Sequence, residues 1–320
     1  MLRMDGFEFH HAESPEAAVR LYAELDSPMY IAGGTDLLPN LKHRIIRPRN
    51  LIGIGRALDQ GWTKEDGTWV IGAGTRLTEL SRMTQLPALA EAAGLVAGPQ
   101  IRNMGTIGGN VLLDTRCLFY NQTEFWRKSL GWCLKAEGDW CHVINGPKTC
   151  VAAQSSDTVP VLLAMDASIR LVGPGGNRDL SMRDLYQFNG MDHLKIEAGE
   201  LLTQIRIPLL QEGTRSTYRK LRRRDSIDFP QLGLAIVIAL NGAQVDSLDI
   251  VVGAVNPQPK PIRKLEGFVG NELNDEAIDG IGALVEKQTR PQRSIVGEPD
   301  WRRKMAGHFT RTALRELRDA

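Results

Sequence analysis

The sequence predicts an α+β protein in which an α/β N-terminal part precedes a separate C-terminal α+β domain with a small antiparallel sheet. The chain has 320 residues, more than one minimal hydrophobic core requires. Residues 30–38 and 70–77 repeat one pattern, a strand followed by a glycine turn and then a helix. After about residue 213, three strand-like runs and two helical segments follow. We therefore expect two α/β subdomains, residues 1–57 and 58–213, and a C-terminal domain, residues 214–320.

The first subdomain is predicted to alternate strands and helices. A short strand, FEFHH, precedes a helix in ESPEAAVRLYAEL, for which Ser14 is the N-cap, Pro15 the first helical residue and Glu16 a first-turn acid. PMYIAGGTDLLPNLK then predicts a strand, a glycine turn and a short helix. LIGI predicts a third strand.

The second subdomain is predicted to begin with the strand, turn and helix of TWVIGAGTRLTELSR. A helix in LPALAEAAGLVA and a loop followed by a strand in TIGGNVL come next. DTVPVLLAMDASIRLVG predicts a short helix and a strand, PGGN a hairpin turn, and ELLTQIRIPL a strand that Pro208 ends. The C-terminal strands are expected in STYRKLRRR, LGLAIVIAL and SLDIVVGAV, and the helices in NDEAIDGIGALVEKQ and DWRRKMAGHFTRTALRELRD.

Composition and charge exclude several classes of function. The formal net charge is +1, so no global field attracts nucleic acid or an acidic membrane surface. The sequence has no run of 18 apolar residues and no apolar core of a secretory signal near its start. We expect a cytoplasmic protein. No nucleophile–base motif or paired carboxylates stand out, which suits electron transfer better than acid–base or nucleophilic chemistry.

Two glycine motifs are the first candidate binding elements. Gly33, Gly34 and Thr35 follow a strand, and Thr106, Gly108, Gly109 and Asn110 have the same ingredients. Glycine permits positive φ and a close approach of backbone N–H groups to phosphate. Two such loops would clamp the phosphates of a dinucleotide, although a single glycine pair is more often a tight turn. Neither motif is the G-x-G-x-x-G fingerprint, so a Rossmann site is not indicated.

Three motifs in this order resemble the FAD-binding subunit of the molybdenum hydroxylase (xanthine dehydrogenase) family. They are AGGTDLLPNLK, then IRNMGTIGGNV, then SSDTVPVLLAMDA. The resemblance extends into the C-terminal segment and covers most of the chain. It implies that the two α/β subdomains form a PCMH-type domain that binds FAD, and that residues 214–320 form the C-terminal domain of the flavin subunit.

The resemblance also implies the residues that contact FAD. Those around the pyrophosphate would be Tyr30, Ile31, Ala32, Gly33, Gly34, Thr35, Asp36 and Leu37, and those of the second wall Thr106, Gly109 and Asn110. Asp157 would bind the nucleotide part, although the pattern alone allows it to cap the following helix. Val96 lies at an apolar contact of the family. For a later lysine of the family, Lys220 is the candidate, and Pro230 is the residue that an alternative alignment places there.

All four cysteines lie in an insert of about residues 113–153. Cys117, Cys133, Cys141 and Cys150 have the spacing C-x15-C-x7-C-x8-C. In the common family pattern the GGN and SD motifs are about ten residues apart, whereas 46 residues separate Asn110 from Asp157 here. Disulfides are not expected in a cytoplasmic chain. Zinc sites usually use close C-x2-4-C pairs, and widely spaced thiolates suit an iron–sulfur cubane. A cubane, zinc or neither remain alternatives on spacing alone.

The composition of the insert suggests how it would be held together. Trp126, Trp132 and Trp140 are three of the six tryptophans in the chain. Their rings are expected to form a small apolar core that shields a cluster, or else to pack on the domain. His142 is expected to be a surface residue rather than a ligand.

Within the family, the insert is similar to that of 4-hydroxybenzoyl-CoA reductases, which carries a [4Fe–4S] cluster. The resemblance of the insert implies an electron-transfer subunit that carries FAD and a [4Fe–4S] cluster. It also implies a complex with a molybdenum-cofactor subunit and a [2Fe–2S] subunit, assembled as a dimer of heterotrimers. Electrons would come from a ferredoxin-like donor and serve the reductive dehydroxylation of 4-hydroxybenzoyl-CoA to benzoyl-CoA on the molybdenum subunit. The alternatives are an oxidising molybdenum hydroxylase of another aromatic or purine substrate, and a non-redox zinc-stapled nucleotide-binding scaffold.

Overall fold

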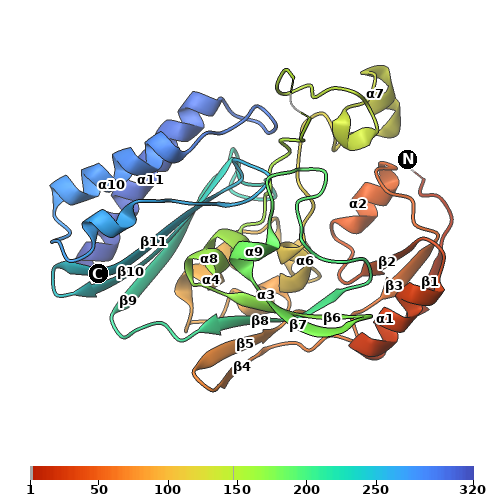
Figure 1. The fold of residues 1–320 in the computed structure, drawn as a ribbon, viewed down its shortest axis with the longest axis horizontal. Coiled ribbons are helices and arrows are strands. Elements are labelled where there is room, and N and C mark those ends of the chain that lie inside the picture. The colour runs from red at the N-terminus through yellow and green to blue at the C-terminus, as the bar shows by residue number, and fades with distance from the viewer. Residues whose placement is uncertain (1–2, 147) are drawn as a thin grey trace.

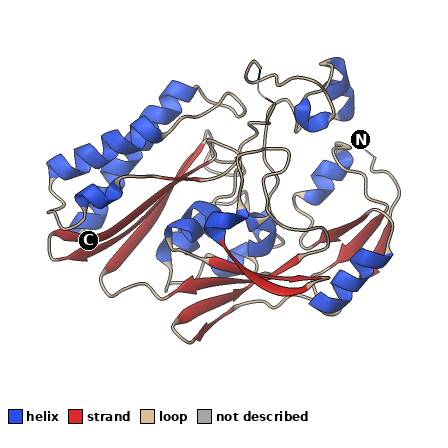
Figure 2. Ribbon diagram, in the orientation of Figure 1, coloured by secondary structure: helices blue, strands red, loops and turns tan. Residues whose placement is uncertain are grey.

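A computed structural model describes residues 3–146 and 148–320. The fold contains three sheets, which lie side by side in Figure 1 with the N-terminal sheet at the right and the C-terminal sheet at the left. Helices cover these sheets, and the insert with its short helix projects at the top (Figures 1 and 2). The predicted α+β class and the antiparallel sheet of the C-terminal domain are confirmed.

The N-terminal subdomain is a small parallel sheet with helices beside it. Its strand order is β1-β3-β2, and both pairings are parallel. Ser14 caps the first helix as predicted, because its Oγ accepts a hydrogen bond from the Ala17 amide at 3.1 Å. The elements are β1 (Glu8–His11), α1 (Pro15–Glu24), β2 (Pro28–Ile31), α2 (Leu37–Lys42) and β3 (Asn50–Gly53).

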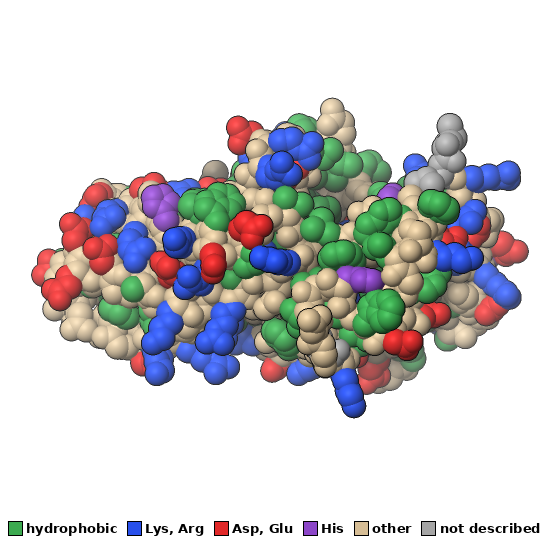
Figure 3. Space-filling view, turned by 90° about the horizontal axis from the view of Figure 1, so that it is seen from above, with side chains coloured by type: hydrophobic (Ala, Val, Ile, Leu, Met, Phe, Trp, Pro, Cys, Tyr) green, Lys and Arg blue, Asp and Glu red, His purple; other side chains and the backbone are tan. Residues whose placement is uncertain are grey.

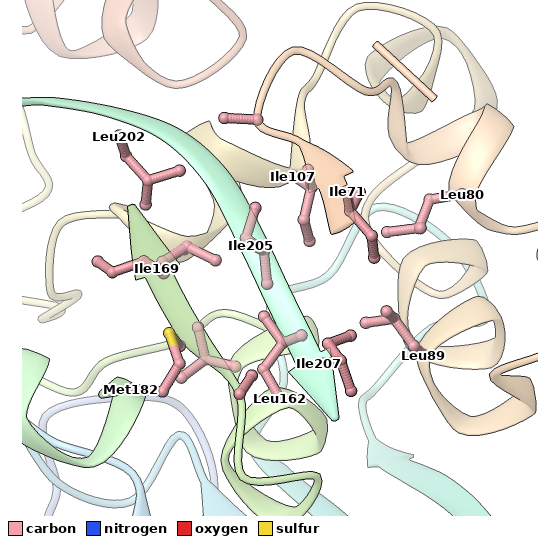
Figure 4. Packing of buried hydrophobic residues seen from close by; sticks show 14 of the residues in the cluster. Ile71, Leu80, Leu89, Ile107, Leu162, Ile169, Met182, Leu202, Ile205 and Ile207 are labelled. Atoms are coloured by element: carbon pink, nitrogen blue, oxygen red, sulfur yellow. The ribbon is translucent and has the colours of Figure 1, made fainter. Parts of the chain in front are cut away.

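The second subdomain is built on an antiparallel sheet of order β4-β5-β8-β6-β7. Its strands are β4 (Trp62–Glu65), β5 (Thr68–Gly72), β6 (Ser168–Gly173), β7 (Gly176–Ser181) and β8 (Leu201–Pro208). Its helices are α3 (Leu77–Leu80), α4 (Pro87–Gly94), α5 (Pro99–Arg102), α6 (Ile107–Val111), α7 (Glu124–Ser129), α8 (Thr158–Ala164) and α9 (Met182–Leu185). Figure 4 shows the core between them, where Ile71, Ile205 and Ile207 of the sheet face Leu89 and Leu162 of the helices.

The strand predicted in TIGGNVL is wrong, because these residues form helix α6. Thr106 has extended backbone angles and is the N-cap of α6, where its Oγ1 accepts a hydrogen bond from the Gly109 amide at 3.1 Å. A side-chain cap that satisfies an otherwise free amide favours a helical turn even where two glycines weaken helix propensity.

The C-terminal domain is an antiparallel sheet of order β12-β11-β10-β9, with a helical hairpin on one face. Along β10, the side chains of Leu234 and Ile236 pack toward this hairpin, whereas Ala235 and Val237 join the core of the flanking subdomain. Burial on both faces explains the unbroken apolar run in this strand. The elements are β9 (Thr214–Leu221), β10 (Leu232–Asn241), β11 (Gln244–Gly253), β12 (Lys260–Pro261), α10 (Asp275–Gln288) and α11 (Pro299–Asp319).

Most charges of the helical hairpin are on its solvent face. Figure 3 shows positive and negative side chains interspersed over this end of the molecule. Arg302 is an exception, because its side chain is fully buried. The guanidinium donates to the carbonyl oxygens of Gln231, Gln292 and Ala254 at 2.7, 2.9 and 2.8 Å. Burial lowers the pKa of Arg302 to about 10.

Arg302→Met is expected to destabilise the full chain by about 3 kcal/mol, because it leaves buried carbonyl oxygens without donors. Urea unfolding followed by circular dichroism measures the effect. The control is Arg303→Met, which removes a partly exposed arginine whose nearest carboxylate, of Asp300, is 3.6 Å away and should change stability by less than about 0.5 kcal/mol. Equal effects of the two substitutions would contradict the buried role of Arg302.

Candidate functional site

A cavity of about 580 Å³ lies where the two α/β subdomains and the first part of the C-terminal domain meet. It is lined by residues of the turn after β2, the loop between α5 and α6, and the segments around Asp157 and Phe229. The structure brings together thirteen of the fourteen predicted FAD contacts at this cavity. They are Tyr30, Ile31, Ala32, Gly33, Gly34, Thr35, Asp36, Leu37, Val96, Thr106, Gly109, Asn110 and Asp157. We call it the main cavity.

The first wall of the main cavity is the glycine turn after β2. Gly34 has φ +69°, a left-handed conformation that glycine adopts without strain. Gly33 is needed for a different reason: a Cβ there would overlap the carbonyl oxygen of Met104. The turn therefore packs directly on the backbone of the second motif. Tyr30 fixes the end of β2, because its hydroxyl donates to the carbonyl of Gly199 at 2.8 Å.

The second wall is helix α6, and its two glycines differ in role. A Cβ at Gly108 would lie 2.9 Å from the Cβ of Ala73, so this glycine allows close packing on the sheet. Gly109 is exposed within an otherwise buried stretch, and a Cβ there would meet only the Thr106 hydroxyl within 4 Å. The positive φ that we associated with these motifs occurs at Gly34 and not at Gly33 or Gly109. Gly109 instead leaves open space beside the cavity.

Asn110 joins the second and third motifs. Its Oδ1 accepts hydrogen bonds from the hydroxyls of Ser156 and Thr158 at 2.6 and 2.7 Å, and all three side chains are buried. The asparagine therefore holds α6 against the start of α8. These hydrogen bonds form although 46 residues separate Asn110 from Asp157 in the sequence.

Asp157 and Lys220 form a buried ion pair beside the main cavity. The Lys220 Nζ donates to the Asp157 carboxylate at 2.8 Å and to the Leu95 carbonyl at 2.9 Å, and the Tyr218 hydroxyl donates to the other carboxylate oxygen at 2.8 Å. Burial raises the pKa of Asp157 and lowers that of Lys220, and the opposite charges counteract both shifts. Asp157 makes no side-chain cap bond to α8, so the capping alternative is wrong. Lys220 lies behind Asp157 and does not line the cavity.

Sequence reasoning missed a contact at the edge of the main cavity, where Asp36 and Phe229, which line the cavity, meet Arg116, which lines the adjacent groove. The Arg116 guanidinium contacts the Asp36 carboxylate and lies 4.7 Å from the centre of the Phe229 ring. Burial lowers the pKa of Arg116 to about 10. Arg116 immediately precedes Cys117, and its conspicuous position beside the cysteine was the available signal. Pro230 lines an adjacent groove of about 770 Å³ rather than the main cavity.

The base of the insert is closed by two hydrogen bonds between Arg116 and Ala153, at 2.7 and 2.8 Å. Helix α7 is capped by Thr123 and held to the N-terminal subdomain by Arg127, which donates to the carbonyls of His43 and Arg44 at 3.2 and 2.9 Å. The expected tryptophan core is wrong. Trp140 is 56% exposed, and the buried apolar cluster of the insert consists instead of Cys117, Tyr120, Cys133, Cys150 and Ala152.

All four cysteines line one small cavity of about 20 Å³, which we call the cysteine cavity. None is in a disulfide, and only Cys141 is partly exposed. Backbone amides point at two of the sulfur atoms: Val143 donates to Cys141 at 3.4 Å and Ala152 donates to Cys150 at 3.3 Å. Burial raises the pKa of the Cys117 thiol to about 12, and the neighbouring cysteines add to this shift.

The donor set of the cysteine cavity suits a cluster of soft metal ions, because thiolates are its preferred ligands. Among residues 3–146 and 148–320, no group of three or more His, Cys, Asp or Glu side chains is arranged to hold a metal ion. His142 also lines the cavity, but its Nε2 is 2.6 Å from the carbonyl oxygen of Trp132 and is engaged there. The geometry therefore offers four thiols around one space and no ready-made site for a single ion among the described residues.

In the described part of the chain, no helix has the length and apolar character needed to cross a membrane.

The family described as "FAD binding domain in molybdopterin dehydrogenase" matches residues 5–210, and "CO dehydrogenase flavoprotein C-terminal domain" matches residues 216–317. The medium chain of carbon monoxide dehydrogenase from Afipia carboxidovorans is 32% identical over 96% of this chain and 95% of the relative.

Two further comparisons agree. The xanthine dehydrogenase FAD-binding subunit from Escherichia coli O157:H7 is 27% identical over 98% of this chain and 96% of its own length. The reconstituted carbon monoxide dehydrogenase from Oligotropha carboxidovorans has a chain with a TM-score of 0.80 and 29% identity, covering 99% of both chains. With two family matches that together span nearly the whole sequence, the chain belongs to the FAD-binding subunits of the molybdenum hydroxylase family.

Proposed function

We propose that this subunit holds FAD in the main cavity and a [4Fe–4S] cluster in the cysteine cavity, and that it transfers electrons between them. The observation that carries the proposal is that all four cysteines of the chain line one cavity beside the FAD-binding motifs. Four unbridged thiols around one cavity, three of them buried, suit a metal centre, because burial alone disfavours the ionised form of a thiol and a bound metal favours it.

The main cavity supports FAD binding at the predicted positions. The turn at Gly33 and Gly34 and the open surface at Gly109 leave room for phosphate groups to approach the backbone. Asp157 would accept hydrogen bonds from the nucleotide part, and the buried Lys220 would hold its carboxylate in place rather than contact the cofactor. The apolar side chains of Val96, Ile227 and Phe229 would pack against the ring systems.

FAD supplies one- and two-electron chemistry when bound, and an iron–sulfur cluster supplies one-electron transfer. The protein's own part is placement. The insert includes Arg116, whose guanidinium contacts Asp36 and Phe229 of the main cavity, so the neighbouring Cys117 is held close to the proposed flavin site. Amide groups directed at Cys141 and Cys150 would stabilise charge on the sulfur atoms.

The complex that we propose contains a molybdenum-cofactor subunit and a [2Fe–2S] subunit, as a dimer of heterotrimers. Relatives named as medium chains of carbon monoxide dehydrogenase support assembly with other chains. On the resemblance of the insert, we further propose a ferredoxin-like donor and the reductive dehydroxylation of 4-hydroxybenzoyl-CoA to benzoyl-CoA.

An oxidising molybdenum hydroxylase is the second candidate. The names of the relatives, carbon monoxide dehydrogenase and xanthine dehydrogenase, favour it, whereas the four cysteines of the insert favour the reductase. In the oxidising direction electrons would leave through this subunit, and the reacting substrate would again bind to the molybdenum subunit.

Metal and flavin analysis of the anaerobically purified protein tests the proposal. About four irons and four acid-labile sulfides per chain, together with one FAD, are expected. One zinc per chain without labile sulfide would contradict the cluster and would indicate a zinc-stapled scaffold instead. Two activity assays of the complex separate the candidates. Formation of benzoyl-CoA from 4-hydroxybenzoyl-CoA indicates the reductase, and oxidation of carbon monoxide or purines indicates the oxidising hydroxylase.

A further inference from the structure

A buried lysine separates the two cavities. The side chain of Lys135 is 6% exposed and lies in the wall of the cysteine cavity. Its Nζ donates to the Thr115 hydroxyl at 2.6 Å and to the Gly190 carbonyl at 2.9 Å, and it is 4.8 Å from the centre of the Tyr120 ring. These contacts fix the position of the positive charge.

The carboxylate that pairs with Lys135 belongs to the other cavity. Asp114 lines the main cavity, and its Oδ1 lies 2.5 Å from the Lys135 Nζ. The Thr115 amide also donates to this oxygen at 2.8 Å. A single ion pair therefore places its negative end at the proposed flavin site and its positive end at the proposed cluster.

The same lysine is tied to the cysteines through Gly190. The Gly190 amide donates to the Cys150 carbonyl at 2.8 Å, and a Cβ at Gly190 would lie 2.9 Å from the Cys150 sulfur. Gly190 thus packs against one sulfur atom while its carbonyl accepts from Lys135. A shift of the Lys135 side chain would therefore also shift Gly190, which packs on the Cys150 sulfur.

Fixed charges next to a redox centre change its reduction potential. One-electron reduction adds a negative charge, which a nearby cation stabilises and a nearby anion destabilises. Burial strengthens the effect because water screens it less. Lys135 and Asp114 would therefore act on a cluster with opposite signs, and Asp114 would also act on the flavin.

We propose that Lys135 is the buried cation that raises the reduction potential of the cluster, and that its ion pair with Asp114 electrostatically couples the cluster to the flavin site. This inference rests on the proposed function. It assigns to Lys135 and Asp114 a role that the FAD-binding motifs and the cysteines do not supply.

The test is a redox titration of the purified complex, with the cluster followed by EPR and the flavin by visible absorbance. Lys135→Met should lower the cluster potential, changing the ratio of reduced to oxidised cluster at fixed solution potential by about tenfold, or about 59 mV for a one-electron couple. Asp114→Asn should raise the potentials of both cluster and flavin. Lys128→Met, which removes an exposed lysine of the same insert, is the matched control and should leave both potentials unchanged.

Opposite shifts in the first two variants support the coupling. Shifts of the same sign, or no shift in a Lys135→Met protein that retains its iron, would overturn it and leave the proposed function standing. If Lys135→Met loses its iron, the Asp114→Asn variant decides: raised potentials of cluster and flavin support the proposal, and unchanged or lowered potentials overturn it. A wild-type protein without labile sulfide would instead refute the proposed function itself.

Discussion

Gly109→Val is expected to weaken FAD retention by about 5- to 150-fold without unfolding the chain. Gly109 is exposed toward the main cavity, and a Cβ there meets only the Thr106 hydroxyl within the protein. The added methyl groups would therefore occupy space that the cofactor needs, a steric conflict of about 1–3 kcal/mol. The ratio of flavin absorbance to protein after gel filtration measures the loss, and the melting temperature of the flavin-free protein reports on the fold.

Two other glycines supply the comparison. Gly55→Ala should keep full flavin content, since nothing lies within 4 Å of a Cβ there and the residue does not line the cavity. Gly33→Ala should lose both flavin and stability, because its Cβ would overlap the Met104 carbonyl. A Gly109→Val protein with wild-type flavin content would show that no part of FAD approaches this wall.

The glycine motifs and the C-terminal domain were predictable because local chemistry determines them. Ser14 and Pro15 mark the start of α1 in the sequence as they do in the fold. The apolar run of β10 is long enough to require burial on both faces. The family resemblance implied residues 30–37 as a group, and because they are contiguous, one turn brings all of them to the cavity.

Other features depend on contacts between distant residues and left no local pattern. Helix α6 forms where two glycines predict a loop, because Thr106 caps it. Arg302 is buried in a helix whose other arginines indicate a solvated face, and only the three carbonyls that it meets explain this. Lys135 and Asp114 are 21 residues apart, and neither belongs to a motif. The aromatic residues of the insert were misjudged because hydrophobicity alone does not say which side chain faces the cysteines.

Cys133→Ser is expected to abolish the low-temperature EPR signal of a reduced cubane and to leave FAD bound. Cys133 is buried in the wall of the cysteine cavity, and a serine hydroxyl is a poor substitute for a soft thiolate ligand of iron. Iron content should fall well below about four per chain, and reduction by a low-potential one-electron donor should slow by at least about tenfold. Electron exchange between FAD and the other subunits should be unaffected, since no cysteine lines the main cavity.

The matched control for this variant is His142→Gln. His142 lines the same cavity, but its ring is stacked on Phe119 and its Nε2 is engaged with the Trp132 carbonyl. The control should therefore retain iron, labile sulfide and the EPR signal, which separates loss of a ligand from disturbance of the insert. Retention of the full cubane signal in Cys133→Ser, or its loss in His142→Gln alone, would mean that the cluster is held by a ligand set other than the four cysteines.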